Sequence, residues 1–161
     1  MGAGITALPE DCFYGCEKLT TINLDNITSY GTSCLRYSGI NSLKLNNNTS
    51  FSNAAFIYTT NLTNVTLPTN ISTIVEDMFA GCTSLTSLTI PNTVTSIETA
   101  AFYQCTKLEL TVPASVTSFG ESCFENVKMV YCTSNSACAK YCEENGVKYK
   151  LTDVAPPNAN D

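Results

Sequence analysis

The chain has 161 residues, a formal net charge of −6 and no His. Its length is that of one ordinary domain. The absence of a basic run argues against nucleic acid as a partner, because phosphates require clustered Lys and Arg. No apolar stretch is long enough to cross a membrane as a helix, so direct membrane insertion of this segment is not expected. Thr, Ser and Asn together make up about a third of the chain.

The chain opens on four residues that lead directly into a repeated pattern. Residues 1–4 are interpreted as an added start or a truncated N-terminus, since neither a cap nor a signal peptide precedes the pattern at Ile5. Residues 5–132 then contain about six units of roughly 22–23 residues. One large apolar residue recurs in each unit, at Phe13, Leu35, Phe56, Phe79, Phe102 and Phe124.

A short apolar alternation follows each of these residues. Alternation at period two places one face of a strand in the core, and a period near 22 is too short for a pair of helices. The pattern therefore predicts one short parallel strand per coil, with turns or 3₁₀ segments on the convex side. The alternating pairs are Ile22/Leu24, Leu43/Leu45, Val65/Leu67, Leu88/Ile90 and Leu110/Val112, and a sixth near Met129/Tyr131 is doubtful because the unit is shortened there.

The segment from Leu85 to Leu108 carries a recognisable motif, L-x-x-L-x-I-P-x-x-V-x-x-I-x-x-x-A-F-x-x-C-x-x-L. It resembles the BspA-like, Treponema-type leucine-rich repeat. The resemblance implies an α/β leucine-rich-repeat solenoid, often found on a cell surface and used in adhesion and recognition. It carries no catalytic residues. We therefore expect an extracellular or cell-surface location, in a fragment of a longer protein.

The C-terminal part predicts a cap over the last coil, in residues 133–152. Ser134 or Ser136 is a suitable helix N-cap, a helix is expected over residues 137–145, and Gly146 stands where a C′ glycine belongs. Val147, Tyr149 and Leu151 alternate as a final strand. Residues 153–161 are predicted to be a disordered tail or linker.

The outward side chains of the predicted strands form a candidate protein-binding surface on the concave face. This face is polar, nearly uncharged and without aromatic residues, so weak or multivalent contact with a protein or matrix component is expected. Aromatic and basic side chains such as Tyr37 and Arg36 are placed in the turns instead. An alternative is a structural spacer, or a surface-layer component that self-associates through an uncapped N-terminal edge. The candidate residues are Thr21, Asn23, Asp25, Ser42, Lys44, Asn46, Asn64, Thr66, Ser87, Thr89, Glu109 and Thr111.

Nine cysteines leave at least one thiol without an intrachain partner. Most share two repeat positions that suit a small core side chain, so reduced core cysteines are expected. A disulfide among Cys132, Cys138 and Cys142 stays open. Zinc is not expected, because no CxxC pair and no His occurs.

Six Asn-x-Ser/Thr sequons lie in a stretch without Asp or Glu, at Asn26, Asn47, Asn48, Asn61, Asn64 and Asn70. They arise by chance in so polar a chain, or they form a glycan-bearing sector in a secreted protein. Both interpretations stay open.

No enzyme is predicted, and no catalytic residue, cofactor or metal ligand is assigned. Glu10, Glu76 and Glu121 share one repeat position. At about 4.8 Å per coil they would lie about 10 Å or more apart, beyond the separation that glycoside hydrolysis needs. A cysteine nucleophile would have no His to activate it.

Overall fold

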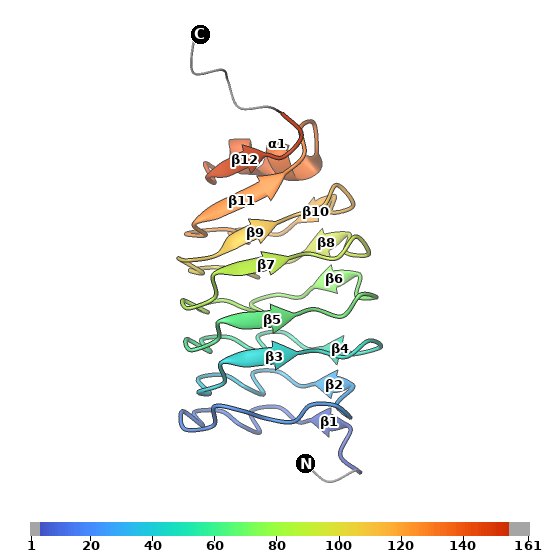
Figure 1. The fold of residues 1–161 in the computed structure, drawn as a ribbon, viewed down its shortest axis with the longest axis vertical. Helices are drawn as coiled ribbons and strands as arrows, with labels where there is room; N and C mark the ends of the chain where they lie inside the picture. The colour runs from blue at the N-terminus through green and yellow to red at the C-terminus, as the bar shows by residue number, and fades with distance from the viewer. Residues whose placement is uncertain (1–3, 155–161) are drawn as a thin grey trace.

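The computed structural model describes residues 4–154, in which the chain winds into a stack of coils rising from the N-terminus to the C-terminus (Figure 1). Most of the predicted start and tail, residues 1–3 and 155–161, lie outside the described residues. No helix among the described residues is long and apolar enough to cross a membrane. We number the coils 1 to 6 by the core residues at the recurring position from Phe13 to Phe124.

The longer strands form the front sheet, which runs up the middle of Figure 1 and is parallel throughout. Its hydrogen bonding is in two parts, because β3 pairs only with β5, while β7, β9, β11 and β12 form a separate four-stranded sheet. A discontinuity, here called the seam, therefore separates coils 3 and 4. The strands are β3 (Ser42–Lys44), β5 (Asn64–Thr66), β7 (Ser87–Thr89), β9 (Glu109–Thr111), β11 (Met129–Cys132) and β12 (Tyr149–Leu151).

Shorter strands form a second row along one side of the stack (Figure 1). They too are parallel, and their pairing is interrupted between the same two coils, since β4 and β6 belong to different sheets. The seam thus crosses both rows. The strands are β1 (Ala7–Leu8), β2 (Ser29–Tyr30), β4 (Ser50–Phe51), β6 (Thr73–Ile74), β8 (Ser96–Ile97) and β10 (Ser118–Phe119).

The core is a column of stacked rings between the two rows of strands. Phe56, Phe79, Phe102 and Phe124 are buried, and their ring centroids lie 5.4, 5.6 and 6.3 Å apart from one coil to the next. Such offset stacking adds to the free energy of burying the rings. The column confirms the repeat position that the sequence predicts for the core.

The convex turn of each coil bonds to the next coil through alternate backbone groups. Phe56 N–H donates to the carbonyl of Met78 (3.1 Å), and Phe79 N–H donates to that of Ala101 (2.9 Å). The residues two before and two after each core position have a positive φ, between 53° and 71°. This conformation turns the alternate N–H groups toward the next coil. The convex side consists of these turns, and the described residues contain no 3₁₀ helix.

Gly81 shows why this turn constrains side chains. Its φ is +71°, and a Cβ at this position would lie 2.2 Å from the Tyr58 ring. Only glycine allows the Tyr58 ring to lie flat over the next coil.

All nine cysteines are free in the structure, in line with the predicted reduced state. The thiol of Cys105 donates to the carbonyl of Phe79 (3.1 Å), and that of Cys82 donates to the carbonyl of Phe56 (3.4 Å). Thr59, at the same repeat position, donates to the carbonyl of Leu35 (3.0 Å). Burial raises the pKa of Cys105 to about 12, so its thiol stays protonated and keeps this bond.

Coil 1 departs from the prediction, because residues 21–25 form no strand. Hydrogen bonds of side chains replace the expected main-chain pairing of strands there. The amide of Asn46 donates to the carbonyls of Leu24 and Asp25 (both 2.9 Å), and the Asn23 side chain accepts from the Asp25 N–H (2.9 Å). The inward direction of the alternation still holds, since Leu24 is buried and Ile22 is packed against the core.

The predicted cap is confirmed. Helix α1 spans Ala137–Glu144, with Ser136 as its N-cap accepting from the Ala139 N–H, and Gly146 follows the helix with a φ of +66°. Tyr141 stacks on Phe119 at 5.0 Å and so covers the last coil. Asp153, expected in the tail, instead accepts bonds from the N–H and hydroxyl of Ser134 (both 2.7 Å), so the cap extends one residue further.

The ring column predicts unequal effects of two phenylalanine truncations. Phe102→Ala removes a fully buried ring and should lower the free energy of unfolding by about 3–5 kcal/mol. Phe13→Ala removes a ring that is only partly buried at the end of the stack and should cost clearly less. Urea denaturation of the two variants measures both values. Equal losses would contradict a core that is weaker at the first coil.

Candidate binding surface

The side chains that point outward from the front sheet form two rows, which run across the strands from one coil to the next. The strand registers align them coil by coil, so each row is a ladder of neighbouring side chains. Eight of the twelve predicted surface residues lie in these rows. The first row is Ser42, Asn64, Ser87, Glu109 and Met129, and the second is Lys44, Thr66, Thr89, Thr111, Tyr131 and Lys150.

The structure does not place the other four candidates on a front strand. Thr21, Asn23 and Asp25 are exposed on coil 1, where the expected strand is missing. Asn46 follows β3 and is half-buried, with its amide bonded to coil 1. These four residues therefore lie at the N-terminal margin of the ladder, and Asn46 holds coils 1 and 2 together.

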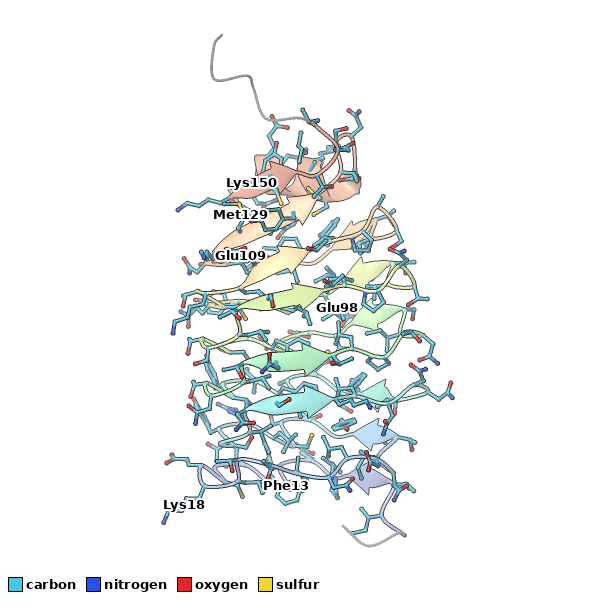
Figure 2. The ribbon with its side chains drawn as sticks, in the orientation of Figure 1. Phe13, Lys18, Glu98, Glu109, Met129 and Lys150 are labelled. Atoms are coloured by element: carbon cyan, nitrogen blue, oxygen red, sulfur yellow. The ribbon has the colours of Figure 1, made fainter. Side chains whose placement is uncertain are left out.

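The sequence analysis missed three members of the rows, namely Met129, Tyr131 and Lys150. The shortened last unit explains two of them. The inward Val130 comes only six positions after Phe124, whereas Leu110 comes eight positions after Phe102. Val130 and Cys132 are buried, so the expectation that Met129 and Tyr131 form the inward pair is wrong. As a result, the front face does contain an aromatic ring, which the sequence analysis did not expect. Figure 2 labels Glu109, Met129 and Lys150 on the upper strands of this face.

A shallow hollow of about 350 Å³ lies on the front face at the seam. The strands on its two sides are not hydrogen-bonded to each other, so main-chain polar groups of β5 and β7 are free to meet a ligand. Its lining combines hydroxyls and one carboxylate with a small apolar floor. The lining residues are Val65, Thr66, Leu67, Ser87, Leu88, Thr89, Pro91, Glu109 and Thr111.

Glu109 is the charged centre of the upper part of this face. Its carboxylate accepts from the Lys128 ammonium at 2.8 Å and from the Tyr131 hydroxyl at 3.3 Å. The hydrogen bond and charge of Lys128 hold the pKa of Glu109 below its usual range and raise the pKa of Lys128. The pair neutralises the local charge and leaves the centre of the front face without net charge.

A second exposed group of residues lies on the convex side of coils 1 to 3. The rings of Tyr37 and Tyr58 stack at 5.2 Å, Tyr14 meets Tyr37 edge-on at 5.9 Å, and the Arg36 guanidinium lies 5.1–5.8 Å from all three ring centroids. Tyr14 is 52% exposed and Tyr37 38%. Tyrosine and arginine are residue types enriched in binding hot spots. The sequence placed these residues in turns, but only the structure brings them into one cluster.

All six sequon asparagines are exposed, at positions 26, 47, 48, 61, 64 and 70. Some of their amides are already engaged. Asn70 donates to the side chain of Asn48 (2.7 Å), and Asn47 accepts from the N–H and hydroxyl of Thr69. Glycosylation of these residues stays a prediction.

Within residues 4–154, no group of three His, Cys, Asp or Glu residues is arranged to hold a metal ion. The three repeat-related carboxylates, Glu10, Glu76 and Glu121, lie in separate convex turns.

Two rows of parallel strands stacked coil on coil, with a capped end and an apolar column inside, define a leucine-rich-repeat solenoid. The family model for the BspA type leucine rich repeat region matches six copies in this chain, over residues 1–109 and 49–149. The chain belongs to this family. This match confirms the family resemblance that the motif from Leu85 to Leu108 indicates.

Two solved bacterial structures are similar. A leucine-rich repeat protein from Bacteroides ovatus is 19% identical with a TM-score of 0.69, over 84% of this chain and 43% of its own. A leucine rich cell surface protein from Faecalibacterium prausnitzii is 25% identical with a TM-score of 0.61, over 94% of this chain and 36% of its own. The chain thus spans less than half the length of these proteins. No curated protein matches it.

The Glu109–Lys128 pair predicts a defined change in titration. Lys128→Met should raise the pKa of Glu109 toward its ordinary range, because the donor that lowers it most is gone. The stabilisation from this carboxylate is present above its unfolded-state pKa and is lost as pH falls through the lowered folded-state value. Carboxyl NMR titration measures the shift. Lys140→Met, which removes the Lys140–Glu144 contact instead, should leave Glu109 unchanged.

Proposed function

We propose that this chain is a non-enzymatic recognition module at the cell surface, which binds a protein or extracellular-matrix partner through the front face. The observation that carries the proposal is the aligned double row of exposed polar side chains beside the seam hollow. In a solenoid, such an extended face presents many contacts at once on a rigid frame. The family supports a protein-interaction module in general.

The proposed location draws on the family and on one relative. The Faecalibacterium prausnitzii protein is described as a cell surface protein, which is a statement about that protein. The specific role that we propose at this location is adhesion.

The chemistry of the front face indicates the kind of contact. Hydroxyls and amides of Thr66, Thr89 and Asn64 offer both donors and acceptors, and the charge of Glu109 is balanced by Lys128. Such a surface gains little from electrostatic steering. A polar partner that forms hydrogen bonds with many neutral groups fits this surface. Its affinity then comes from contacts with several coils together.

A pair of substitutions in the hollow tests the proposal. Thr66→Arg combined with Thr89→Arg fills the hollow with long charged side chains, so binding should fall at least tenfold. The measurement is biolayer interferometry against immobilised fibronectin, laminin and collagen as matrix probes. Thr117→Arg, at an exposed threonine directly before β10 in the second row of strands, is the matched control and should bind like the unmodified chain.

Two outcomes contradict the proposed face. Unchanged affinity in the double variant would exclude the hollow. A loss of binding in Tyr37→Ser with no loss in the double variant would assign binding to the convex tyrosine–arginine cluster. Absence of binding to all three probes would exclude these matrix proteins as partners.

A second candidate function is self-association through the N-terminal edge. In the stack, carbonyls of a convex turn accept bonds from the coil before it, as those of Glu76, Met78 and Ala80 do in coil 4. The corresponding carbonyls of coil 1, those of Glu10, Cys12 and Tyr14, accept no bond from any described residue. Phe13, Leu19 and Ile22 are only partly buried at the same edge, and Figure 2 labels Phe13 on the lowest coil. Unpaired acceptors beside apolar surface are the features of an edge that another chain can cover.

Light scattering over a concentration series tests this second function. The mean mass should rise with concentration, and Cys12→Lys, which places a charge at the exposed edge, should reduce the rise. Asn92→Lys, an exposed position in the middle of the stack, is the matched control. A strict monomer at the highest concentration would contradict self-association.

A further inference from the structure

The convex turn of coil 6 is the last in the stack, and its main-chain N–H groups have no further coil to meet. In coil 5, three alternate N–H groups, those of Ala100, Phe102 and Gln104, donate to carbonyls of coil 6 over 2.9–3.0 Å. The groups at the same positions of coil 6 donate to no described residue. These unpaired donors are the N–H groups of Ser122, Phe124 and Asn126.

The backbone of this last turn keeps the conformation of the turn below it. The φ angle is +54° at Ser122 and +62° at Asn126, against +53° at Ala100 and +58° at Gln104. Because the conformation is the same, the three N–H groups point away from coil 5 and toward the end of the stack, where the cap lies (Figure 1). A main-chain donor in such a place costs free energy unless water or a ligand accepts from it.

A hollow of about 690 Å³, here called the cap hollow, lies between this turn and the cap. Its size falls within the range of about 300–1,000 Å³ in which proteins bind ligands. All three residues with unpaired donors line it. On the other side it is lined by the end of α1 and the segment before β12, at Tyr141, Asn145, Gly146, Val147 and Lys148.

The row of donors indicates a polypeptide main chain as the ligand. Between coils 3, 4, 5 and 6, such a row always donates to carbonyls of alternate residues in the next turn. A peptide segment from another chain offers carbonyls at this same spacing, as when a strand is added to an open edge. The row therefore has the geometry to pair with a peptide.

The charges around the cap hollow favour an uncharged ligand. Its lining contains two carboxylates, Glu121 and Glu125, and two ammonium groups, Lys128 and Lys148. The ammonium of Lys128 is already bound by Glu109 at 2.8 Å. An anion such as phosphate would thus meet two carboxylates and one unpaired ammonium, whereas neutral carbonyls bring no charge.

The cap also limits the side chains that the ligand can carry. The Tyr141 ring lies edge-on to Phe124 at 5.6 Å between ring centroids, beyond the last ring of the column. It therefore takes the place that the core ring of a further coil would need. A segment in the cap hollow has to supply a main chain with small side chains and no core residue.

We propose that the cap hollow is a second binding site, which takes an extended, uncharged segment of a partner polypeptide with small side chains. The carbonyls of this segment accept from the N–H groups of Ser122, Phe124 and Asn126, as those of a further coil would. The site uses none of the residues in the front-face rows and does not rest on the proposed function.

Amide NMR of the unmodified chain tests the contact. The probe is an acetylated and amidated heptapeptide of alternating alanine and threonine, which is uncharged and has small side chains. On titration, the amide protons of Ser122, Phe124 and Asn126 should move downfield, because they gain acceptors. The amide proton of Phe79, which is already bonded to Ala101 in the middle of the stack, should keep its position.

A pair of substitutions that fills the cap hollow supplies a second readout. Glu125→Trp combined with Lys148→Trp places two rings in it from exposed positions and leaves the net charge unchanged. Peptide affinity, measured by isothermal titration calorimetry, should fall about tenfold or more. Lys140→Trp combined with Glu143→Trp is the matched control, because both positions are exposed on α1 outside the hollow, and it should bind like the unmodified chain.

Three outcomes overturn the proposal. Unmoved amide protons at saturating peptide would show that water alone satisfies the three donors. A shift caused by inorganic phosphate but not by the peptide would identify an anion site instead. Equal peptide affinity of the filled and the control variants would place the peptide elsewhere. Should the filled variant fail to fold, the amide shifts of the unmodified chain decide by themselves.

Discussion

The backbone ladder between convex turns is the interaction on which the rest of the structure depends. In coil 4, for example, the N–H groups of Asp77, Phe79 and Gly81 donate to three carbonyls of coil 5 over 2.7–3.1 Å. This ladder sets the spacing at which the core rings stack, and it continues across the seam, where both rows of strands lose their pairing. Two left-handed residues per turn are required to aim these groups, and the chain adopts them even at Tyr37 and Tyr58.

That constraint explains why the front face is available for recognition. The hydrogen bonds of the turns and the packing of the core already hold the coils together. The outward side chains of the strands are therefore not needed for stacking, and many of them are Thr, Ser and Asn. Where the strand ladder is interrupted at the seam, the hollow opens without loss of the stack. The surface and the seam hollow are thus consequences of where the fold is and is not hydrogen-bonded.

The two ends of the stack satisfy the same ladder differently. At the C-terminal end, α1 covers the last rings with Tyr141, and Asp153 ties the loop before the helix through Ser134. At the N-terminal end, coil 1 has no strand on the front face, and its Phe13, Leu19 and Ile22 are only partly buried. The proposal of self-association concerns how firmly the N-terminal end is closed.

The sequence by itself determined the repeat length, the core position from Phe13 to Phe124, and the capping helix with Ser136 and Gly146, because these depend on local periodicity and local caps. Tertiary structure decided the rest. Residues 21–25 form no strand, since Asn46 takes the place of the ladder, and Tyr131 points outward because of a register set by pairing with β9. The seam and the tyrosine–arginine cluster involve residues from different coils, whose contacts depend on distances that no single repeat encodes.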